Sequence, residues 1–256
     1  MLHLTRNLIV AAALALPALP AAAADEALDL RAMTPDQRDA FGEAVRSYLL
    51  ENPEVIFDAI RILEERRNAA AATADAELVA ANADALHADG FSWVGGNPEG
   101  DVTIVEFADY RCGYCKRAHP QIKEVLAADP NVRLVVKEFP ILGPDSVAAA
   151  RMAMAALELN ASRYEALNDE LMRFQGNLTE AIAYRLAAQV GYDIGDLKER
   201  AAADDIADRV NRTYELADRL GIQGTPSFVI GDSIIRGYVE ADAILAAVGA
   251  VRAAAN

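Results

Sequence analysis

Two cysteines three residues apart, Cys112 and Cys115, lie between a strand pattern and a helix pattern, and the 256-residue chain has no others. The short, β-branched run 102–108 predicts a buried strand. A helix is expected from about residue 116 to 127, and residues 132–139 predict the next strand. These elements form a β–α–β unit with the cysteines at its first strand-to-helix junction.

The rest of the chain predicts a helical insertion within this α/β arrangement. A composition shift at 89–90 marks the expected start of the main domain, 90–256, after which a turn-rich loop leads into the first strand. Strands return at 227–230 and near 234–235, and a helix over 240–253 closes the chain. The intervening segment, about 144–221, has a helical pattern. Four helices are expected there, over 145–159, 162–173, 178–190 and about 194–220.

Residues 25–89 are expected to form an N-terminal helical segment. Thr34 can cap a helix that begins at Pro35, and Gln37 completes a capping box. Its apolar side chains follow one stripe at helical spacing: Phe41, Val45, Leu49, Ile56, Ile60 and Leu63. The segment has no second element to cover this stripe. We therefore expect the stripe either to fold back onto the main domain or to make the protein a homo-oligomer, a trimer or a dimer.

The first 24 residues predict a cleavable signal peptide. A short positive region precedes an apolar run over 8–16, which two prolines and the alanines 21–24 follow. Cleavage is expected after Ala24 or Ala23. The apolar run is too short to span a membrane, so we expect export to the periplasm. The chain carries 24 Lys and Arg against 39 Asp and Glu, and no nucleic-acid partner is expected because phosphate neutralisation needs clustered cations.

The cysteine pair is better placed for reaction than for stabilisation. Structural disulfides of exported proteins close long loops, whereas a pair at this spacing closes almost none. Cys112 lies where a helix begins, and the unpaired N–H groups there favour its thiolate. Cys112 is therefore the expected nucleophile of thiol–disulfide exchange, and Cys115 the thiol that resolves the mixed disulfide.

A metal site is the alternative interpretation of the pair. Structural zinc needs four ligands, and only His87 and His119 remain beside the cysteines after signal removal. A Cu(I) site could add Met152 or Met154, although their helical spacing predicts core packing. We therefore expect redox chemistry with no metal or other cofactor.

Glu106 is the other candidate catalytic residue, because a carboxylate is costly to bury within an apolar strand. Burial would raise its pKa towards the working range of a proton acceptor. Lys137 on the next strand could pair with it, and the two could simply satisfy each other. His119 could tune the thiolate, but a solvated helix histidine is expected. Trp93 and Tyr110 could line a peptide groove or pack in the core.

Several motifs together resemble the DsbA-type thioredoxin family, and in particular its ScsC-like and Com1-like periplasmic branch, which carries an added N-terminal helical segment. The resemblance covers roughly residues 34–252. The motifs are Gly96-Asn97-Pro98, Asp101-Val102-Thr103, Val105-Glu106-Phe107, Asp109-Tyr110, Cys112-Gly113-Tyr114-Cys115-Lys116-Arg117, the run from Lys137 to Pro144 and the run from Gly221 to Phe228. It implies a thioredoxin fold with an inserted helical domain and the added N-terminal segment.

The resemblance also assigns roles at the site. It implies that Thr225-Pro226 is a cis-proline loop facing the cysteines, and that Glu106 lies beneath the disulfide and helps move the proton of the second cysteine. An X–Pro bond tolerates the cis form, which would leave the Thr225 backbone free to pair with an extended substrate. The alternative is an ordinary trans turn. Gly113 and Tyr114, between the cysteines, would tune the redox chemistry.

The expected function is disulfide exchange with exported proteins that contain cysteines, supported by a membrane thiol-redox partner protein. Gly113-Tyr114 and the Thr before the proline resemble isomerases and reductases more than strong oxidases, and an oligomerisation segment agrees with this direction. An oxidase of the same family is the alternative. A copper-binding or chaperone-like periplasmic protein is the alternative of a different class.

Overall fold

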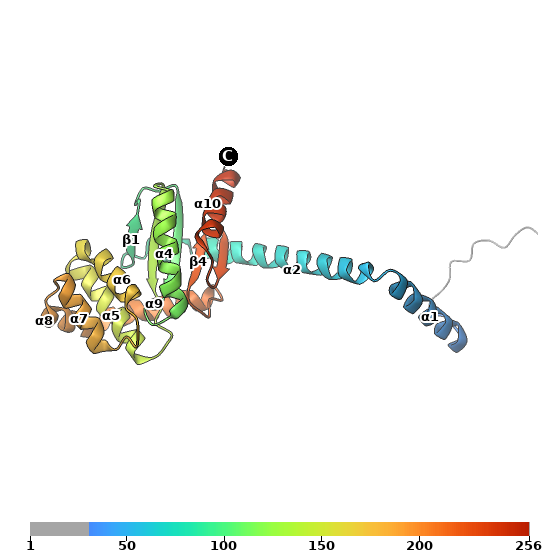
Figure 1. Ribbon diagram of the computed structural model, residues 1–256, viewed down its shortest axis with the longest axis horizontal. Helices are drawn as coiled ribbons and strands as arrows, with labels where there is room; N and C mark the ends of the chain where they lie inside the picture. Colours follow the sequence, from blue (N-terminus) through green and yellow to red (C-terminus); the bar gives the residue numbers. More distant parts are fainter. Residues whose placement is uncertain (1–30, 256) are drawn as a thin grey trace, which may run out of the picture. The chain divides into compact units, whose positions relative to one another are not determined.

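The computed structural model describes residues 31–255 (Figure 1). They divide into two compact units, with the division between Ile62 and Leu63. The expected signal peptide, 1–24, lies outside the described residues. Within the part of the chain that is described, no helix combines the length and the apolar character needed to cross a membrane.

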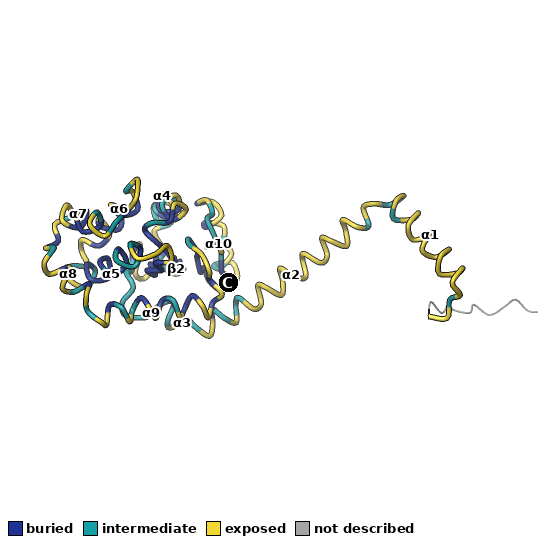
Figure 2. The backbone as a smooth tube through the Cα atoms, turned by 90° about the horizontal axis from the view of Figure 1, so that it is seen from below, coloured by how far each residue is buried: buried dark blue, intermediate teal, exposed yellow. Residues whose placement is uncertain are grey.

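The first unit is helical, as its sequence predicts. Helix α1 (Pro35–Glu51) begins with the expected capping box, in which the Thr34 hydroxyl accepts from the Gln37 N–H and the Gln37 side chain accepts from the Thr34 N–H. The chain breaks at Asn52, and helix α2 (Glu54–Ala81) follows. No residue of α1 is buried, and Figure 2 shows α1 and the start of α2 almost wholly in the exposed colour. The apolar stripe therefore has no cover within this unit.

The second unit is built on a mixed sheet of five strands in the order β1-β3-β2-β4-β5. The strands are β1 (Trp93–Gly96), β2 (Val102–Ala108), β3 (Val132–Glu138), β4 (Ser227–Ile230) and β5 (Ser233–Arg236). Strands β2 and β3 are parallel, as the β–α–β prediction requires, and the other neighbours are antiparallel. Strand β1 was not predicted, because Gly95 and Gly96 indicate a turn. Its pairing with β3 extends the sheet by one strand.

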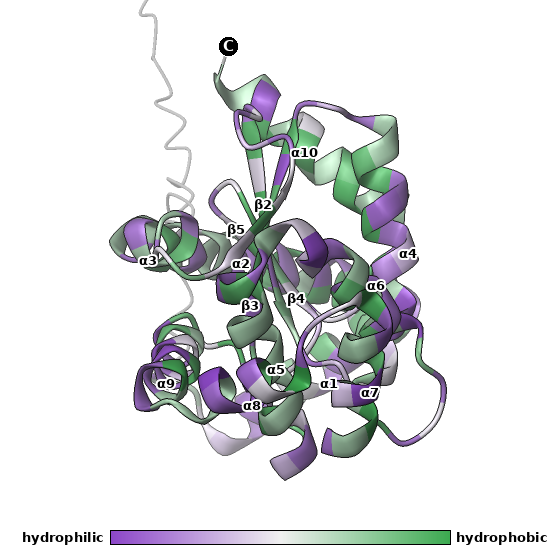
Figure 3. Ribbon diagram, turned by 90° about the vertical axis from the view of Figure 1, so that its left-hand side faces the viewer, coloured by the Kyte–Doolittle hydropathy of each residue, from purple (hydrophilic) through white to green (hydrophobic). Residues whose placement is uncertain are grey.

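Successive side chains of β2 point to opposite faces of the sheet, and a separate part of the core lies on each face. Ile104 packs with helices α4 (Gly113–Ala128) and α10 (Ala241–Ala255). Val105 and Phe107 face the opposite side, where helix α9 (Asp204–Arg219), helix α3 (Ala83–His87) and the end of α2 pack. Figure 3 shows α4 on one side of the sheet and α3 and α9 on the other. Both faces are covered, which explains why β2 is almost continuously apolar.

Four helices and a short 3₁₀ turn separate β3 from α9. They are α5 (Pro144–Leu159), η1 (Ala161–Arg163), α6 (Tyr164–Arg173), α7 (Glu180–Val190) and α8 (Ile194–Ala202). The single helix expected over 194–220 is wrong, because Ala203 adopts an extended conformation that separates α8 from α9. Arg200 at the end of α8 and Asp205 at the start of α9 form an ion pair across this break, and each charge suits its helix terminus.

The end of α2 and helix α3 belong to the second unit. Val79 and Leu86 are buried against Val105 and Phe107. The structure therefore places its division ahead of the boundary expected near residue 89. From Asp75, which pairs with Arg236 of β5, the chain lies against the sheet, and Val79 and Leu86 help to cover one of its faces.

Candidate functional site

The two cysteines lie at the first turn of α4, directly after the central strand β2. Cys112 is the N-cap residue of α4, with extended backbone angles, and its carbonyl accepts from the Lys116 N–H at 3.1 Å. Both cysteines are free thiols in the structure. Cys112 keeps 8% of its surface exposed, whereas Cys115 is fully buried. Only the first sulfur can be reached from solvent.

The same geometry gives the two thiols different pKa values. The hydrogen bond with the Cys115 side chain lowers the pKa of Cys112 to about 5, with further help from the Thr225 side chain and the N–H groups of Cys115 and Tyr114. The pKa of Cys115 is raised, first by that shared hydrogen bond and then by burial and by the charge of Glu106. At neutral pH the exposed sulfur is therefore a thiolate and the buried one a thiol.

A loop from the far end of the chain completes the surroundings of Cys112. The Thr225-Pro226 peptide bond is cis, as predicted, and it directly precedes β4. The Thr225 carbonyl lies 3.2 Å from Cys112 Sγ. Residues 113 positions apart in the sequence are thus in contact at the site. The Thr225 backbone lies beside the nucleophile, where an extended peptide would present its sulfur.

Glu106 is buried in β2, with 4% of its surface exposed. Burial alone raises its pKa to about 7, so the carboxyl can take up or release a proton near neutrality. Among the described residues, Glu106 Oε1 has no hydrogen-bond partner. The side chain is therefore a buried acid that no cation neutralises.

The predicted pairing of Glu106 with Lys137 is wrong. In the parallel register, Glu106 lies opposite Val136 and Phe107 lies opposite Lys137, so the two side chains point to different faces of the sheet. Lys137 Nζ instead donates to Asp89 Oδ2 at 2.6 Å and to the Ala85 carbonyl at 2.7 Å.

The expectation of a solvated His119 is also wrong. Its surface is 9% exposed, and Nε2 lies 2.7 Å from Asp169 Oδ1 on α6. Burial lowers the pKa of His119, although Asp169 acts in the opposite direction. Lys123 donates to the other oxygen of Asp169. His119 is thus part of a half-buried ionic cluster between α4 and α6.

Tyr110 and Trp93 pack in the core rather than in a groove. The Tyr110 and Tyr164 hydroxyls both donate to Glu138 Oε1 at 2.7 Å, and the Trp93 and Tyr164 rings lie 5.3 Å apart. Burial raises the pKa of Glu138 to about 8. Sequence reasoning missed this second buried acid, which ends β3 on the same face as Glu106. A glutamate at the end of an apolar strand was the available signal.

Aromatic and apolar side chains with exposed surface lie in the cysteine motif or contact residues next to it. Tyr114, between the two cysteines, is 58% exposed, and its ring lies 6.3 Å from that of Tyr238. The Arg117 guanidinium lies over the Tyr238 ring at 4.6 Å. Ile141 and Leu142 are exposed as well. Such a surface suits apolar segments of another polypeptide.

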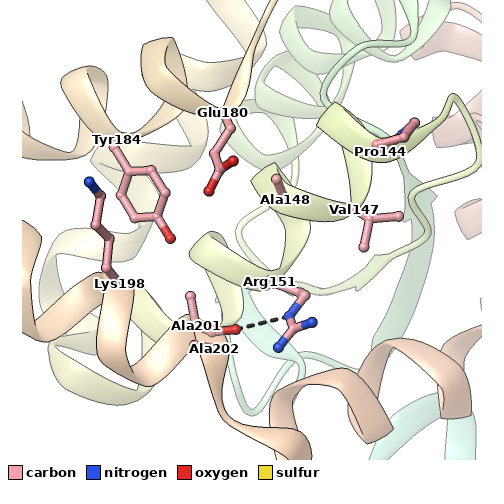
Figure 4. Close-up of a pocket in the computed structure, with 9 residues that line it drawn as sticks. All are labelled: Pro144, Val147, Ala148, Arg151, Glu180, Tyr184, Lys198, Ala201 and Ala202. Carbon is pink, nitrogen blue, oxygen red and sulfur yellow. Dashed lines mark hydrogen bonds between the residues drawn. The ribbon is translucent and has the colours of Figure 1, made fainter.

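A cavity of about 730 Å³ lies in the helical insertion (Figure 4). Pro144, Val147, Ala148, Arg151, Glu180, Tyr184, Lys198, Ala201 and Ala202 line it. Arg151 is held at its edge by the Ala201 carbonyl, at 2.9 Å. None of these residues belongs to the cysteine motif or the cis-proline loop. In the described part of the chain, no group of three or more His, Cys, Asp or Glu side chains could hold a metal ion.

Comparison with known proteins agrees with this geometry. A family model described as the DSBA-like thioredoxin domain matches residues 103–249, and one described as the copper resistance protein ScsC N-terminal domain matches residues 37–70. A thioredoxin-like oxidoreductase from Silicibacter pomeroyi DSS-3 is 43% identical, with a TM-score of 0.64, over 66% of this chain and 97% of that one. The catalytic domain of Proteus mirabilis ScsC is 29% identical, with a TM-score of 0.64, over 70% of this chain and 98% of that one.

A curated relative of different size is similar to part of this chain. The Na(+)/H(+) antiporter NhaA 3 of Salinispora tropica is 32% identical over 165 residues, which are 64% of this chain. The chain spans only a quarter of the length of that relative, 25%. The thioredoxin fold with its helical insertion and N-terminal helices is confirmed. This chain belongs to the DSBA-like thioredoxin domain family.

Proposed function

We propose that this chain is a thiol–disulfide oxidoreductase that acts in the periplasm on exported proteins, chiefly as a disulfide isomerase or reductase. The difference between the two thiols at the start of α4 carries the proposal. The pKa of Cys112 is lowered to about 5, whereas that of Cys115 is raised. A reachable thiolate beside a buried thiol is the arrangement that a nucleophile and a resolving thiol require. Residues 1–24 would direct export and be removed.

The exchange proceeds in two steps. The Cys112 thiolate attacks one sulfur of a substrate disulfide, the bond between Cys112 and the substrate forms, and the other substrate sulfur leaves as a thiolate. The Cys115 thiol then gives its proton to Glu106, and the resulting thiolate attacks Cys112 Sγ. The Cys112–Cys115 disulfide forms while the substrate leaves as a second thiolate. The substrate gains the two electrons that the enzyme loses, and a membrane thiol-redox partner protein would return them.

Isomerisation needs only the first of these steps. A different thiolate of the same substrate attacks the mixed disulfide, a new substrate disulfide forms, and Cys112 is released with no net transfer of electrons. The backbone of Thr225, next to the cis Pro226, would bind the substrate as an extended strand. Gly113 and Tyr114 would set how strongly the thiolate is stabilised.

The first unit supports a role as an isomerase, because an oligomer formed through it would present several cysteine pairs to one substrate. Side chains of the apolar stripe are exposed in the structure, with Phe41 at 44%, Ile56 at 49% and Ile60 at 47%. Covering each large apolar side chain contributes roughly 1.5–3 kcal/mol. We propose that copies of this unit pack together as a trimer or dimer.

Light scattering on the full chain tests the oligomer. Replacing Ile60 by Asp should shift the mass towards that of a monomer, whereas replacing the exposed Asn68 of the same helix by Asp adds the same charge and should change nothing. The proposal also requires the Ile60 variant to lose repair of scrambled disulfides while it keeps reductase activity. A monomeric wild-type protein would exclude the oligomer.

An oxidase is the second candidate, and the acidity of Cys112 favours it. A pKa of about 5 lies between the values near 7 and near 3.5 that are typical of thioredoxin and of DsbA. The reduction potential of the cysteine pair distinguishes an oxidase from an isomerase or reductase. A value near −120 mV would indicate an oxidase, and a value of about −180 mV or below would suit an isomerase or reductase.

A copper-binding role is the candidate of a different class, and the description of the family model over residues 37–70 favours it. Cys112 and Cys115 would then hold Cu(I) as thiolates. Met154 lies in a different core cluster from the cysteines, whereas Met152 is buried in the same cluster as both of them. Metal analysis of protein purified under reducing conditions tests this role, and one bound copper for each chain would support it.

A further inference from the structure

The face of helix α4 that begins at Cys112 continues into a hollow at the protein surface. Positions 116, 119, 120 and 123 follow Cys112 at spacings of three and four residues, so they lie on one face of the helix. Side chains at these positions, together with Met172, Arg173 and Gln175 at and after the end of α6, line a hollow of about 460 Å³. Helices α4 and α6 lie side by side there (Figure 3).

This hollow is rich in positive charge, and we call it the basic hollow. Three of its lining side chains are cations, Lys116, Lys123 and Arg173. Among the described residues that line it, none is an Asp or a Glu. Pro120 and Met172 contribute apolar surface. The whole chain has a formal net charge of −15, so the charge gathered here is opposite in sign to that of the protein.

The carboxylates that balance these cations lie deeper than the cations themselves. Lys123 donates to Asp169, which also lies 3.6 Å from Arg173. The side chain of Asp169 is 17% exposed, against 38% for Lys123 and 64% for Arg173. The charge of Asp109 acts on Lys116, but Asp109 is buried. A ligand that enters the basic hollow therefore meets the cations first, and two carboxylates do not neutralise three cations.

We propose that the basic hollow binds acidic side chains of the polypeptide substrate, near the substrate cysteine that reacts with Cys112. The inference rests on the proposed function, in which Cys112 attacks a disulfide of an exported protein. Pro120, in the middle of the hollow, is about 12 Å from Cys112 along the helix, at a rise of about 1.5 Å for each residue. An extended chain covers that distance in about four residues. The hollow therefore selects Asp or Glu about four residues from the substrate cysteine.

The position of the cations favours a polypeptide over a membrane surface. Lys116 donates to the Phe174 carbonyl and lies 5.6 Å from the centre of the Phe174 ring, and Lys123 is held by Asp169. Both ammonium groups are thus fixed between two helices, where a single side chain can reach them. Charges attract a partner over about 10 Å in physiological salt, so these cations act on a bound substrate more strongly than the distant negative charges of the chain.

The test compares peptides that differ only in charge at the proposed distance. Each peptide has one cysteine, joined to thionitrobenzoate by a disulfide, and a pair of Asp, Asn or Lys residues about four positions from it. Stopped-flow mixing with the reduced full-length protein measures release of the coloured thionitrobenzoate thiolate as Cys112 bonds the peptide sulfur. Each rate is divided by the rate of the same peptide with dithiothreitol, which removes differences in the peptide's own reactivity.

The wild type should react roughly tenfold faster with the Asp peptide than with the Lys peptide in about 0.01 M salt. In about 1 M salt, where screening is nearly complete, the two rates should be about equal. Arg173→Gln should lower the Asp-to-Lys ratio by roughly threefold, and Arg173→Glu should reverse the preference. Lys123→Gln should lower the ratio, whereas Lys123→Arg, which keeps the charge, should preserve it.

Lys198→Gln is the matched control, because Lys198 is an exposed cation of α8 that lines the cavity of the helical insertion instead. It should leave the ratio unchanged. If all three peptides react equally fast with the wild type in low salt, or if Arg173→Glu does not change the ratio, the basic hollow has no role in selection and the proposed function stands. If no peptide reacts, the proposed function fails and the selection fails with it. Equal peptide rates, with vesicles of phosphatidylglycerol that bind the wild type and not Arg173→Glu, would assign the hollow to a membrane surface and overturn the proposal.

Discussion

Replacing Glu106 by Gln should make the protein more stable at pH 8 while changing little at pH 4.5. Burial raises the pKa of Glu106 from the ordinary 4.5 to about 7. The unfolded chain therefore ionises this group first, and the folded state loses relative stability as the pH rises from about 4.5 to about 7. At about 1.4 kcal/mol for each pH unit, the full loss is roughly 3 kcal/mol. Gln keeps the shape and cannot ionise, so it escapes this loss.

The assay is urea unfolding of the oxidised protein, in which the cysteines do not titrate. The free energy of unfolding of Glu106→Gln, minus that of the wild type, should grow by roughly 3 kcal/mol between pH 4.5 and pH 8. Glu138 also titrates above its ordinary range, mainly because of burial, and that burial is present in both proteins. The charge of Glu106 raises the pKa of Glu138 further, and its removal in the variant acts in the same direction as the predicted growth. Glu124→Gln, at an exposed position of α4, should show no such growth. An equal difference at both pH values would refute the burial argument.

Three further predictions concern the thiols and the buried charges. Iodoacetamide should alkylate Cys112 at half its maximal rate near pH 5 and leave Cys115 unmodified, and mass spectrometry showing Cys115 labelled first would reverse the assignment. Replacing Lys137 by Met should lower the free energy of unfolding by about 3–5 kcal/mol, since Asp89 would lose its buried partner; a loss under about 1 kcal/mol in urea would contradict this. Replacing Asp109 by Ala should cost about 3 kcal/mol, because the backbone N–H groups of Arg111, Ile141 and Leu142 lose their acceptor. Hydrogen exchange at those three groups should then accelerate.

The sequence was sufficient for the parts of the fold that depend on local pattern. The strands 102–108 and 132–139 and the cysteines at a helix start follow from composition and spacing. The cis-proline loop before β4 was predicted from the resemblance to the DsbA-type family. Strand β1 could not be predicted, since its two glycines have no strand preference and the pairing comes from β3. The break at Ala203 has no Gly or Pro to mark it, and charges at the adjoining helix ends accompany it.

The site was predicted less completely, because its polar contacts join distant segments. His119 and Asp169 are 50 residues apart, and no local pattern relates them. Whether Glu106 meets Lys137 depends on the register between β2 and β3, since a shift of one residue moves a side chain to the other face. A single sequence does not give that register. The burial of Glu106, by contrast, follows directly from its place in an apolar strand.

The contacts of Lys137 limit where this protein can be divided by the protein engineer. Its side chain is 1% exposed, and its ammonium donates to Asp89 and to the Ala85 carbonyl, while Leu86 is fully buried. A chimera that joined a foreign leader at residue 90 would leave the buried Lys137 ammonium without Asp89 and Ala85, and it would expose one face of the sheet. The smallest transplantable catalytic module must therefore begin upstream of Val79 and inherit the last turns of α2.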